Sequence, residues 1–380
     1  MKTYLVGGAV RDQLLGVPVR ERDWVLVGAR EEDLLAQGYR RLDKGFPVFL
    51  HPVSGDECAL ARRERKVSPG YKGFVVDAGP DVTLEQDLVR RDFRVNAMAM
   101  DEAGNLIDPW GGQQDLAAGL LHHVSPAFIE DPVRLVRGAR FCAQLGPLEF
   151  RVAPPTQDLL KHMATFPELE TLLPDRFRDE LLKSMAAARP WRFVRVLEEW
   201  GALQRLAPPL HRALSTGPKL LAGLERASAA TANPAVRLTA LLAPTLDTPD
   251  QANDLARDWG LGRAERDLLV SVTQWPIDRV IAPDGDRLLH LFGSLRAFQQ
   301  PERLRELLLV WRSLEPELGD RVARAVTSAF DAARRVDTRP LIEAGYQGAQ
   351  LGQQVQQQRL GAIRERLASS RVCYPGEIAG

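Results

Sequence analysis

Two carboxylates near the start of the chain have the type and spacing needed to hold a divalent cation. Glu21 and Asp23 stand two residues apart where the apolar run DWVLVG begins. Alternate residues of a β-strand share one face, so both side chains would point the same way. Carboxylate oxygens are the hard ligands that Mg²⁺ takes, and the ion keeps water and phosphate oxygens in its other positions. The simpler alternative is a surface turn in which Arg20 and Arg22 neutralise the two acids.

A glycine pair precedes these acids, at the end of the run TYLV. Gly7 and Gly8 would let the backbone approach a bulky anion, and the helix start that follows offers unpaired N–H groups and a positive dipole end. Arg11 lies one turn into that helix and could reach the same anion. A tight strand–helix turn explains two glycines equally well. Glu21 and Asp23 could hold two metal ions close to that anion. Two such ions, about 3.5–4 Å apart, would clamp the attacking and leaving oxygens of a phosphoryl displacement.

A row of charged residues three apart marks a later segment, Asp131, Arg134, Arg137 and Arg140. Each step of three residues falls back about 60° around a helix. The three arginines would therefore cover one side, and Asp131 would extend their row at its N-terminal end. A solvated charged face is the usual explanation of such a row. The helix also has a separate apolar side, made of Val133, Leu135, Val136 and Phe141. If that side packs against the protein, the arginines would face another element or a ligand.

The elements that must position these residues form an α+β part followed by a helical part. Up to residue 125, short apolar runs alternate with turns, which predicts a small mixed sheet. Strands are predicted at 3–8, 23–29, 46–51 and 58–62, and helices at 9–16 and 30–38. Helices are also predicted at 130–146, 176–188 and 191–203, and every periodic segment after 205 is helical. We expect divisions at 1–125, 126–205 and 206–380.

The composition excludes several classes of protein. The chain has 380 residues, with 50 Lys and Arg against 50 Asp and Glu. Its net charge is therefore near zero, and the overall charge gives no indication of binding to a nucleic acid or a membrane. Any polyanion would have to bind at a local cluster of basic residues, and such clusters occur at 62–66, 90–94 and 134–140. Three cysteines without a CxxC spacing argue against a disulfide framework and against a zinc site. The N-terminal apolar run is too short for a signal or spanning segment. We expect a soluble cytoplasmic protein.

The order of these motifs resembles the nucleotidyltransferase core of the polymerase-β superfamily. More narrowly, it is similar to the class II tRNA nucleotidyltransferases and the bacterial poly(A) polymerases. The resemblance is carried by GG-x-x-RD at 7–12, E-x-D-W at 21–24, ALARRERK at 59–66, DLVRRDFRVNAMAMD at 87–101, LIDPWGGQQDL at 106–116 and SPAFIEDPVRLVRGARF at 125–141. VSPGYKGF at 67–74 resembles the flexible loop of the family. DWVLVG and the run through ALARRERK look most like the CCA-adding members.

This resemblance implies a catalytic head, a helical neck that recognises the base, and a helical body and tail that bind tRNA. The implied reaction is template-independent addition of CCA to the 3′ end of tRNA from CTP and ATP, with release of pyrophosphate. Glu21 and Asp23 would be the catalytic carboxylates and the Mg²⁺ ligands. The implied ATP- and CTP-binding residues are Gly8, Arg11, Arg91, Asp92, Asp131, Arg134, Arg137 and Arg140.

Base selection without a template follows from hydrogen-bond signs. Cytosine and adenine both present an amino donor beside a ring-nitrogen acceptor. A carboxylate accepts from the amino group and a guanidinium donates to the ring nitrogen. Guanine and uracil present the opposite order and leave buried polar groups unpaired, at about 1–3 kcal/mol each. Asp131 and Arg134 match the family positions that read the base in this way.

Two departures from the family pattern affect these expectations. The first metal-binding acid is usually Asp, so Glu21 implies a reduced metal affinity. Many relatives carry a His-Asp phosphohydrolase motif, but Ala243 and Pro244 stand where that pair would fall. We therefore expect no phosphodiesterase or phosphatase activity.

The alternatives to a CCA-adding enzyme are a poly(A) polymerase, a partial CC- or A-adding enzyme, or a catalytically impaired RNA-binding protein. The oligomeric state stays open, with a monomer favoured, and no membrane partner is expected.

Overall fold

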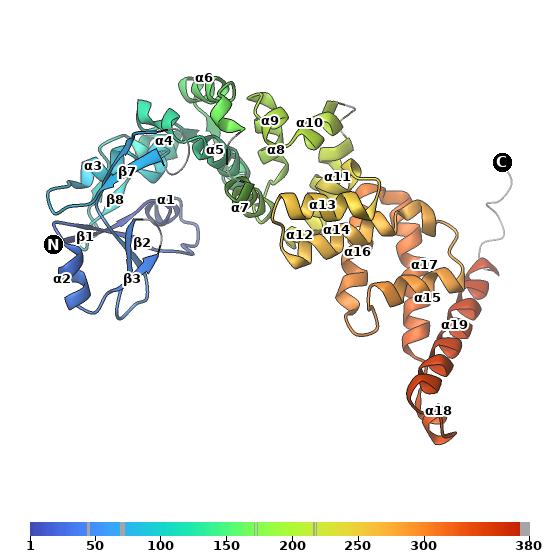
Figure 1. The fold of residues 1–380 in the computed structure, drawn as a ribbon. Helices are drawn as coiled ribbons and strands as arrows, with labels where there is room; N and C mark the ends of the chain where they lie inside the picture. The colour runs from blue at the N-terminus through green and yellow to red at the C-terminus, as the bar shows by residue number, and fades with distance from the viewer. Residues whose placement is uncertain are drawn as a thin grey trace. The chain divides into compact units, whose positions relative to one another are not determined.

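A computed structural model of the chain describes residues 1–43, 46–68, 73–170, 172, 174–215, 217 and 219–372. The chain divides into two compact units, Met1–Pro208 and Pro209–Gly380. The first unit contains the sheets, and the second is helical throughout its described part (Figure 1). The predicted α+β class is confirmed. The proposed divisions at 125 and 205 stay predictions.

A mixed seven-stranded sheet forms the centre of the first unit, in the order β3-β4-β5-β2-β1-β8-β9. Its strands are β1 (Lys2–Val6), β2 (Asp23–Val27), β3 (Arg40–Asp43), β4 (Pro47–Leu50), β5 (Glu57–Leu60), β8 (Ala99–Met100) and β9 (Leu106–Ile107). Strands β2 and β5 run parallel, and the other neighbouring pairs are antiparallel. The four predicted strands correspond to β1, β2, β4 and β5, whereas β3, β8 and β9 were not predicted.

Alternation along the strands divides the apolar core between the two faces of this sheet. Val6 and Val25 pack with Leu88 on one face, which α3 (Leu84–Val89) covers. Leu26 packs with Leu34 on the other face, where α1 (Gly8–Leu14) and α2 (Glu31–Ala36) lie. Helix α3 starts with a capping box, in which the Thr83 and Gln86 side chains and backbones bond reciprocally.

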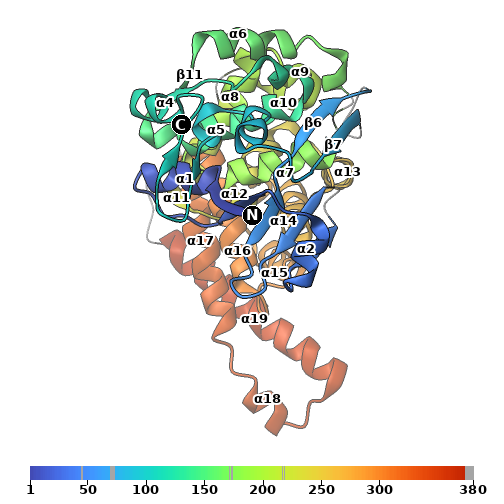
Figure 2. The ribbon, with the colours of Figure 1, turned by 90° about the vertical axis from the view of Figure 1, so that its left-hand side faces the viewer.

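Two smaller sheets complete the strands of the first unit. Strands β6 (Arg63–Lys66) and β7 (Phe74–Asp77) pair antiparallel and lie side by side in Figure 2. We call this hairpin the arm. The segment 67–74, expected to be a flexible loop, falls here, and its residues 69–72 lie outside the described residues. Strands β10 (Leu120–Leu121) and β11 (Arg151–Val152) pair in parallel.

Helices build the rest of the first unit. They are α4 (Gly112–Ala118), α5 (Val133–Gln144), α6 (Pro154–Met163), α7 (Pro174–Met185), α8 (Trp191–Glu199) and α9 (Leu203–Leu206), with short 3₁₀ turns η2 (Arg94–Asn96), η3 (Pro126–Glu130), η4 (Gly146–Leu148) and η5 (Pro167–Leu169). The next helix, α10 (Pro208–Ser215), belongs to the second unit except for its first residue. Helix α5 packs against both α7 and α8. The predicted helices at 130–146, 176–188 and 191–203 are confirmed as α5, α7 and α8.

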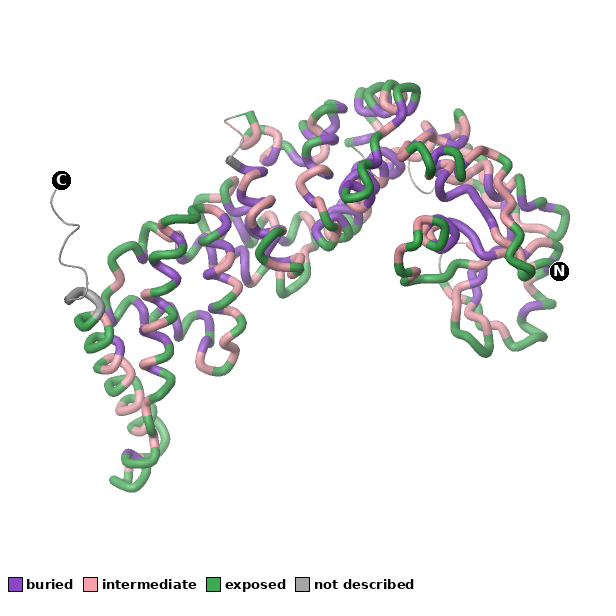
Figure 3. The backbone as a smooth tube through the Cα atoms, turned by 180° about the vertical axis from the view of Figure 1, so that it is seen from behind, coloured by how far each residue is buried: buried purple, intermediate pink, exposed green. Residues whose placement is uncertain are grey.

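The second unit is a set of helices with one long exposed member. Its elements are α11 (Lys219–Ala230), α12 (Pro234–Leu242), η6 (Ala243–Thr245), α13 (Pro249–Asp258), α14 (Arg263–Gln274), η7 (Ile277–Val280), α15 (Gly285–Ser294), α16 (Pro301–Leu314), α17 (Pro316–Arg334), α18 (Arg339–Glu343) and α19 (Gly348–Val372). Helix α19 packs on α17 and α15, and most of its length is not buried (Figure 3). Among the residues of α19 whose side chains are described, only Ile363 is buried. No helix of the described part is long and apolar enough to cross a membrane.

Candidate active site

Two carboxylates lie side by side where β2 and β5 begin. Asp23 is the first residue of β2 and Glu57 is the first residue of β5, and the parallel register makes them direct partners. Partners in register point to the same face of a sheet. Asp23 shares its face with Val25, so both carboxylates lie on the face that α3 covers. Asp23 is exposed and Glu57 is half-buried, which leaves both accessible to a ligand.

Glu57 was missed by the sequence analysis because 34 residues separate it from its partner, and only strand pairing brings the two together. Glu21, the predicted partner, is exposed and lies ahead of β2. Strand geometry therefore does not fix the direction of the Glu21 side chain, contrary to the sequence argument. Within the described residues, no three His, Cys, Asp or Glu side chains gather in a way that could hold a metal ion. A carboxylate pair thus leaves most of the coordination shell to water and substrate.

The glycine turn leaves the sheet beside these carboxylates. Val6 is the antiparallel partner of Asp23, and Gly7 follows it directly. Gly7 adopts a φ of 70°, a conformation that side chains with a Cβ rarely take. A Cβ there would also lie 3.1 Å from Nη1 of Arg91. The structure thus places the strict glycine requirement at Gly7, and it places the Arg91 guanidinium directly over the turn.

Arg11 is buried inside a chain of polar contacts. Its Nη1 donates to Oδ1 of Asn96 over 2.8 Å, and its Nε donates to Oδ1 of Asp12 over 2.9 Å. The Asn96 amide then donates from Nδ2 to Oδ1 of Asp92 over 3.1 Å. Arg137 closes the chain with its Nη2 at 2.6 Å from Oδ2 of Asp92. Helix α1 is thereby linked to helix α5 through the turn η2.

Asp92 is held ionised inside this chain. Burial alone would raise the pKa of its carboxyl, but the charge of Arg137 and hydrogen bonds from Asn96 and the Phe93 backbone lower the pKa well below the ordinary value. Both Asp92 oxygens have partners within the protein. Asp92 therefore fixes α5 against the turn η2, and its predicted role in nucleotide binding stays a prediction.

The charged row of α5 turns inward, as the apolar side predicted. Arg134 is buried and donates from Nη1 to the Ala127 carbonyl over 3.0 Å and from Nη2 to the Arg90 carbonyl over 2.5 Å. Arg140 donates from Nε to Glu180 of α7 over 2.5 Å. Glu180 is a further residue that the sequence analysis missed. A solvated face is thus excluded for Arg134 and Arg140.

Asp131 does not continue the helical row. Its backbone is extended between η3 and α5, and its Oδ1 accepts the Val133 N–H over 3.0 Å. Pro132 prevents the helix from starting earlier, because its ring disfavours a helical conformation at the residue before it. Asp131 therefore lies at the start of α5 rather than on its surface. The roles predicted for it and for the arginines in nucleotide binding stay predictions.

Phe141 lies among three of the candidate arginines. The guanidinium carbons of Arg11, Arg137 and Arg140 lie 5.4, 5.6 and 4.1 Å from its ring centroid. Attraction between a guanidinium and an aromatic face helps to hold like charges close together. Each of these arginines is also paired with a carboxylate, Arg11 with Asp12, Arg137 with Asp92 and Arg140 with Glu180. The first unit thus carries an ordered group of arginines in addition to the strand carboxylates Asp23 and Glu57. This combination suits the binding of metal ions and phosphates and the transfer of a phosphoryl-type group.

The chain is similar to known protein families and to curated proteins over most of its length. Residues 3–122 match the model of the poly A polymerase head domain, and residues 149–214 match that of a probable RNA- and SrmB-binding site of polymerase A. The multifunctional CCA protein of Methylococcus capsulatus is 42% identical, over 98% of this chain and 96% of that protein. A CCA-adding enzyme of Pseudomonas putida is 42% identical, over 96% of this chain and 98% of that protein.

The fold is shared with a solved structure of lower sequence similarity. The Bacillus stearothermophilus CCA-adding enzyme, crystallised with CTP, has a TM-score of 0.63 and 24% identity, over 97% of this chain and 89% of that chain. Family membership implies dependence on a divalent metal ion. The likeness to the two curated relatives extends over nearly the whole length of each protein. The chain belongs to the family of CCA-adding enzymes, which are tRNA nucleotidyltransferases.

Proposed function

We propose that this protein adds CCA to the 3′ end of tRNA from CTP and ATP without a nucleic-acid template. The observation that carries the proposal is the pairing of Asp23 with Glu57 beside the Gly7 turn, over which Arg91 lies. The names of the relatives supply the substrate class. In this reaction the tRNA 3′-hydroxyl attacks the α-phosphate of the nucleotide and pyrophosphate leaves.

We propose Mg²⁺ as the metal ion, because the donor atoms available here are carboxylate oxygens. Asp23 would hold it together with Glu21 or Glu57. When bound, Mg²⁺ would neutralise phosphate charge and lower the pKa of the attacking hydroxyl. Arg91 would bind the triphosphate at the glycine turn, with Gly8 and Arg11 beside it, because transfer of this kind depends on positioning and charge neutralisation.

Base reading is proposed for Asp131 and Arg134 at the start of α5. Arg134 uses two of its N–H groups on backbone carbonyls, which fixes the plane of the guanidinium and leaves further donors for a ring nitrogen. Arg137 and Arg140, on the same helix, would contribute to nucleotide binding beside Arg134.

We propose 1–125 as the catalytic head, 126–205 as the neck, and 206–380 as a tRNA-binding body and tail. We also propose that the enzyme is cytoplasmic and has no phosphohydrolase activity.

A poly(A) polymerase is the second candidate, because the head-domain model carries that name. The test is to incubate the pure protein with Mg²⁺, single labelled nucleotides and tRNA that lacks its terminal CCA. Two C additions followed by one A support CCA addition, and long A tracts support the second candidate. Additions that stop after CC indicate a partial enzyme. Binding of tRNA without incorporation would overturn both candidates.

A further inference from the structure

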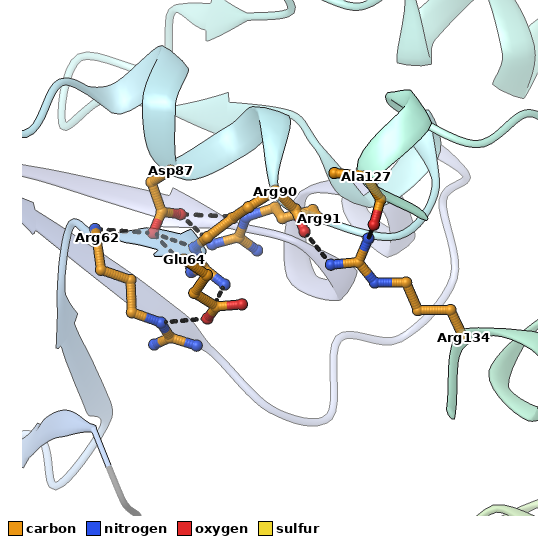
Figure 4. A network of polar contacts seen from close by, with 7 residues as sticks. All are labelled: Arg62, Glu64, Asp87, Arg90, Arg91, Ala127 and Arg134. Atoms are coloured by element: carbon orange, nitrogen blue, oxygen red, sulfur yellow. Dashed lines mark hydrogen bonds and ion pairs between the residues drawn. The ribbon is translucent and has the colours of Figure 1, made fainter. Parts of the chain in front are cut away.

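One buried carboxylate of α3 holds two consecutive arginines by different oxygens (Figure 4). Oδ1 of Asp87 accepts from Nη2 of Arg90 over 2.6 Å and from Nε over 3.1 Å. Oδ2 accepts from Nη2 of Arg91 over 2.9 Å and from Nε over 3.3 Å. The Asp87 side chain is 0% exposed. Each arginine is therefore gripped through two N–H groups, which fixes the plane of its guanidinium.

The two arginines leave Asp87 in different directions. Nη1 of Arg90 donates to Oε1 of Glu64 on the arm over 3.0 Å, and its backbone carbonyl accepts from Arg134. Nη1 of Arg91 lies 3.1 Å from the place where a Cβ of Gly7 would be. The side of Arg91 that Asp87 does not hold thus faces the glycine turn. Asp87 itself stays behind the arginines, away from that turn.

Asp87 remains ionised in this position. Burial would raise the pKa of its carboxyl, but the charges of Arg91 and Arg90 outweigh burial and lower the pKa to about 2. Removing one partner of a buried ion pair leaves the other without compensation. Oδ1 of Asp87 also accepts the backbone N–H of Arg62, which directly precedes the arm, over 3.3 Å. A carboxylate that served only to join α3 to the arm would need this N–H and Arg90, and would not need Arg91. The second pair of bonds, to Arg91, calls for a different explanation.

We propose that Asp87 is a positioning residue for nucleotide binding, which holds Arg91 over the Gly7 turn where the triphosphate is to bind. This inference rests on the proposed function and deepens it. Asp87 acts through Arg91 and does not touch the nucleotide. Pre-organisation of this kind raises affinity because the arginine loses little further freedom when the phosphates arrive.

The Asp87→Asn variant tests this inference, because it keeps the shape of the side chain. An amide has one acceptor oxygen, and its NH₂ group would face the N–H groups of the other arginine. We expect the dissociation constant for CTP, measured by calorimetry without tRNA, to rise about tenfold or more. The KM for CTP should rise similarly, and the affinity for tRNA should stay within about twofold of wild type.

The Arg91→Ala background separates positioning from general support of the fold. Once Arg91 is absent, Asp87→Asn should change CTP affinity by less than about twofold, although it still lowers the melting temperature. A purely structural Asp87 would weaken CTP binding equally in both backgrounds, and that result would overturn the inference. Should Asp87→Asn fail to fold, Asp87→Glu replaces it, since it keeps the charge but displaces Arg91. Wild-type CTP affinity in a folded Asp87→Glu chain would also contradict the inference.

Asp267→Asn in the second unit is the matched control. Asp267 also bonds arginines by both oxygens: Oδ1 accepts from Arg266 over 2.9 Å, and Oδ2 accepts from Arg303 over 3.2 Å and lies 3.5 Å from Nε of Arg263. The Asp267→Asn variant should lower stability without changing the dissociation constant for CTP.

The proposed function and the role proposed for Asp87 can be refuted separately. A wild-type chain that incorporates no nucleotide refutes the proposed function, whereas an active wild-type chain whose Asp87→Asn variant binds CTP normally refutes the role of Asp87.

Discussion

Arg137 on α5 forms an ion pair with Asp92, whose Oδ2 lies 2.6 Å from Nη2 of the arginine. The carboxylate is 7% exposed and the arginine side chain is 34% exposed. Asp92 follows α3, and Arg137 lies 45 residues further along the chain on α5. The ion pair therefore fixes the candidate base-reading helix relative to the turn η2.

This ion pair predicts a measurable coupling in the free energy of unfolding. We expect Asp92→Asn to destabilise the protein by about 2 kcal/mol, less than the loss of a fully buried pair, because Arg137 is partly exposed. Arg137→Gln should cost less, and the double variant should cost less than the sum of the two. Urea unfolding of the four chains measures this cycle. Additive losses would mean that the two side chains do not interact in solution.

The candidate metal ligands predict unequal effects on nucleotide transfer. Asp23→Asn should lower kcat about a thousandfold, because several kcal/mol of transition-state stabilisation depend on the metal site. Glu21→Asp should stay active and reach half-maximal rate at a lower Mg²⁺ concentration. Transfer of CMP to tRNA, titrated with Mg²⁺, measures both. Complete loss of activity in Glu21→Asp would contradict the role assigned to Glu21.

Arg134→Ala should lose discrimination between bases before it loses all turnover. Without the guanidinium, UTP and GTP no longer meet a mismatched donor, so the preference for CTP and ATP should fall about tenfold or more. The kcat/KM values for the four nucleotides measure this effect. Arg178→Ala, which removes a guanidinium bonded to Asp175 and Asp179 on α7, is the control and should keep wild-type ratios. Unchanged ratios in Arg134→Ala would refute the base-reading role.

The depressed pKa of Asp87 predicts a loss of stability in acid. The unfolded carboxyl binds a proton near its ordinary pKa of 3.8, whereas the folded one does so only near 2. The stabilisation is therefore complete above about pH 4 and is lost as the pH falls toward 2, on the order of 2 kcal/mol in all. Unfolding free energies of wild type and Asp87→Asn, measured across this range, should converge as the pH falls. A constant difference would show that folding does not lower the pKa of Asp87.

The sequence by itself determined the local elements and the order of the motifs. Strand alternation predicted β1 and β2, and the apolar side of 130–146 predicted an inward arginine row on α5, because periodicity depends only on neighbours along the chain. Pro132 could also have indicated that Asp131 precedes the helix. The short strands β8 and β9 carry too few residues for any period to show.

Only the tertiary structure decided which of these residues meet. The parallel register of β2 and β5 sets Glu57 beside Asp23, whereas sequence spacing had favoured Glu21. Packing of α3 against the sheet sets Asp87 behind Arg91, and it sets Arg91 over Gly7. Contacts of this kind depend on strand register and burial across tens of residues. A one-residue change of register would turn the side chains to the other face, which no local pattern can specify.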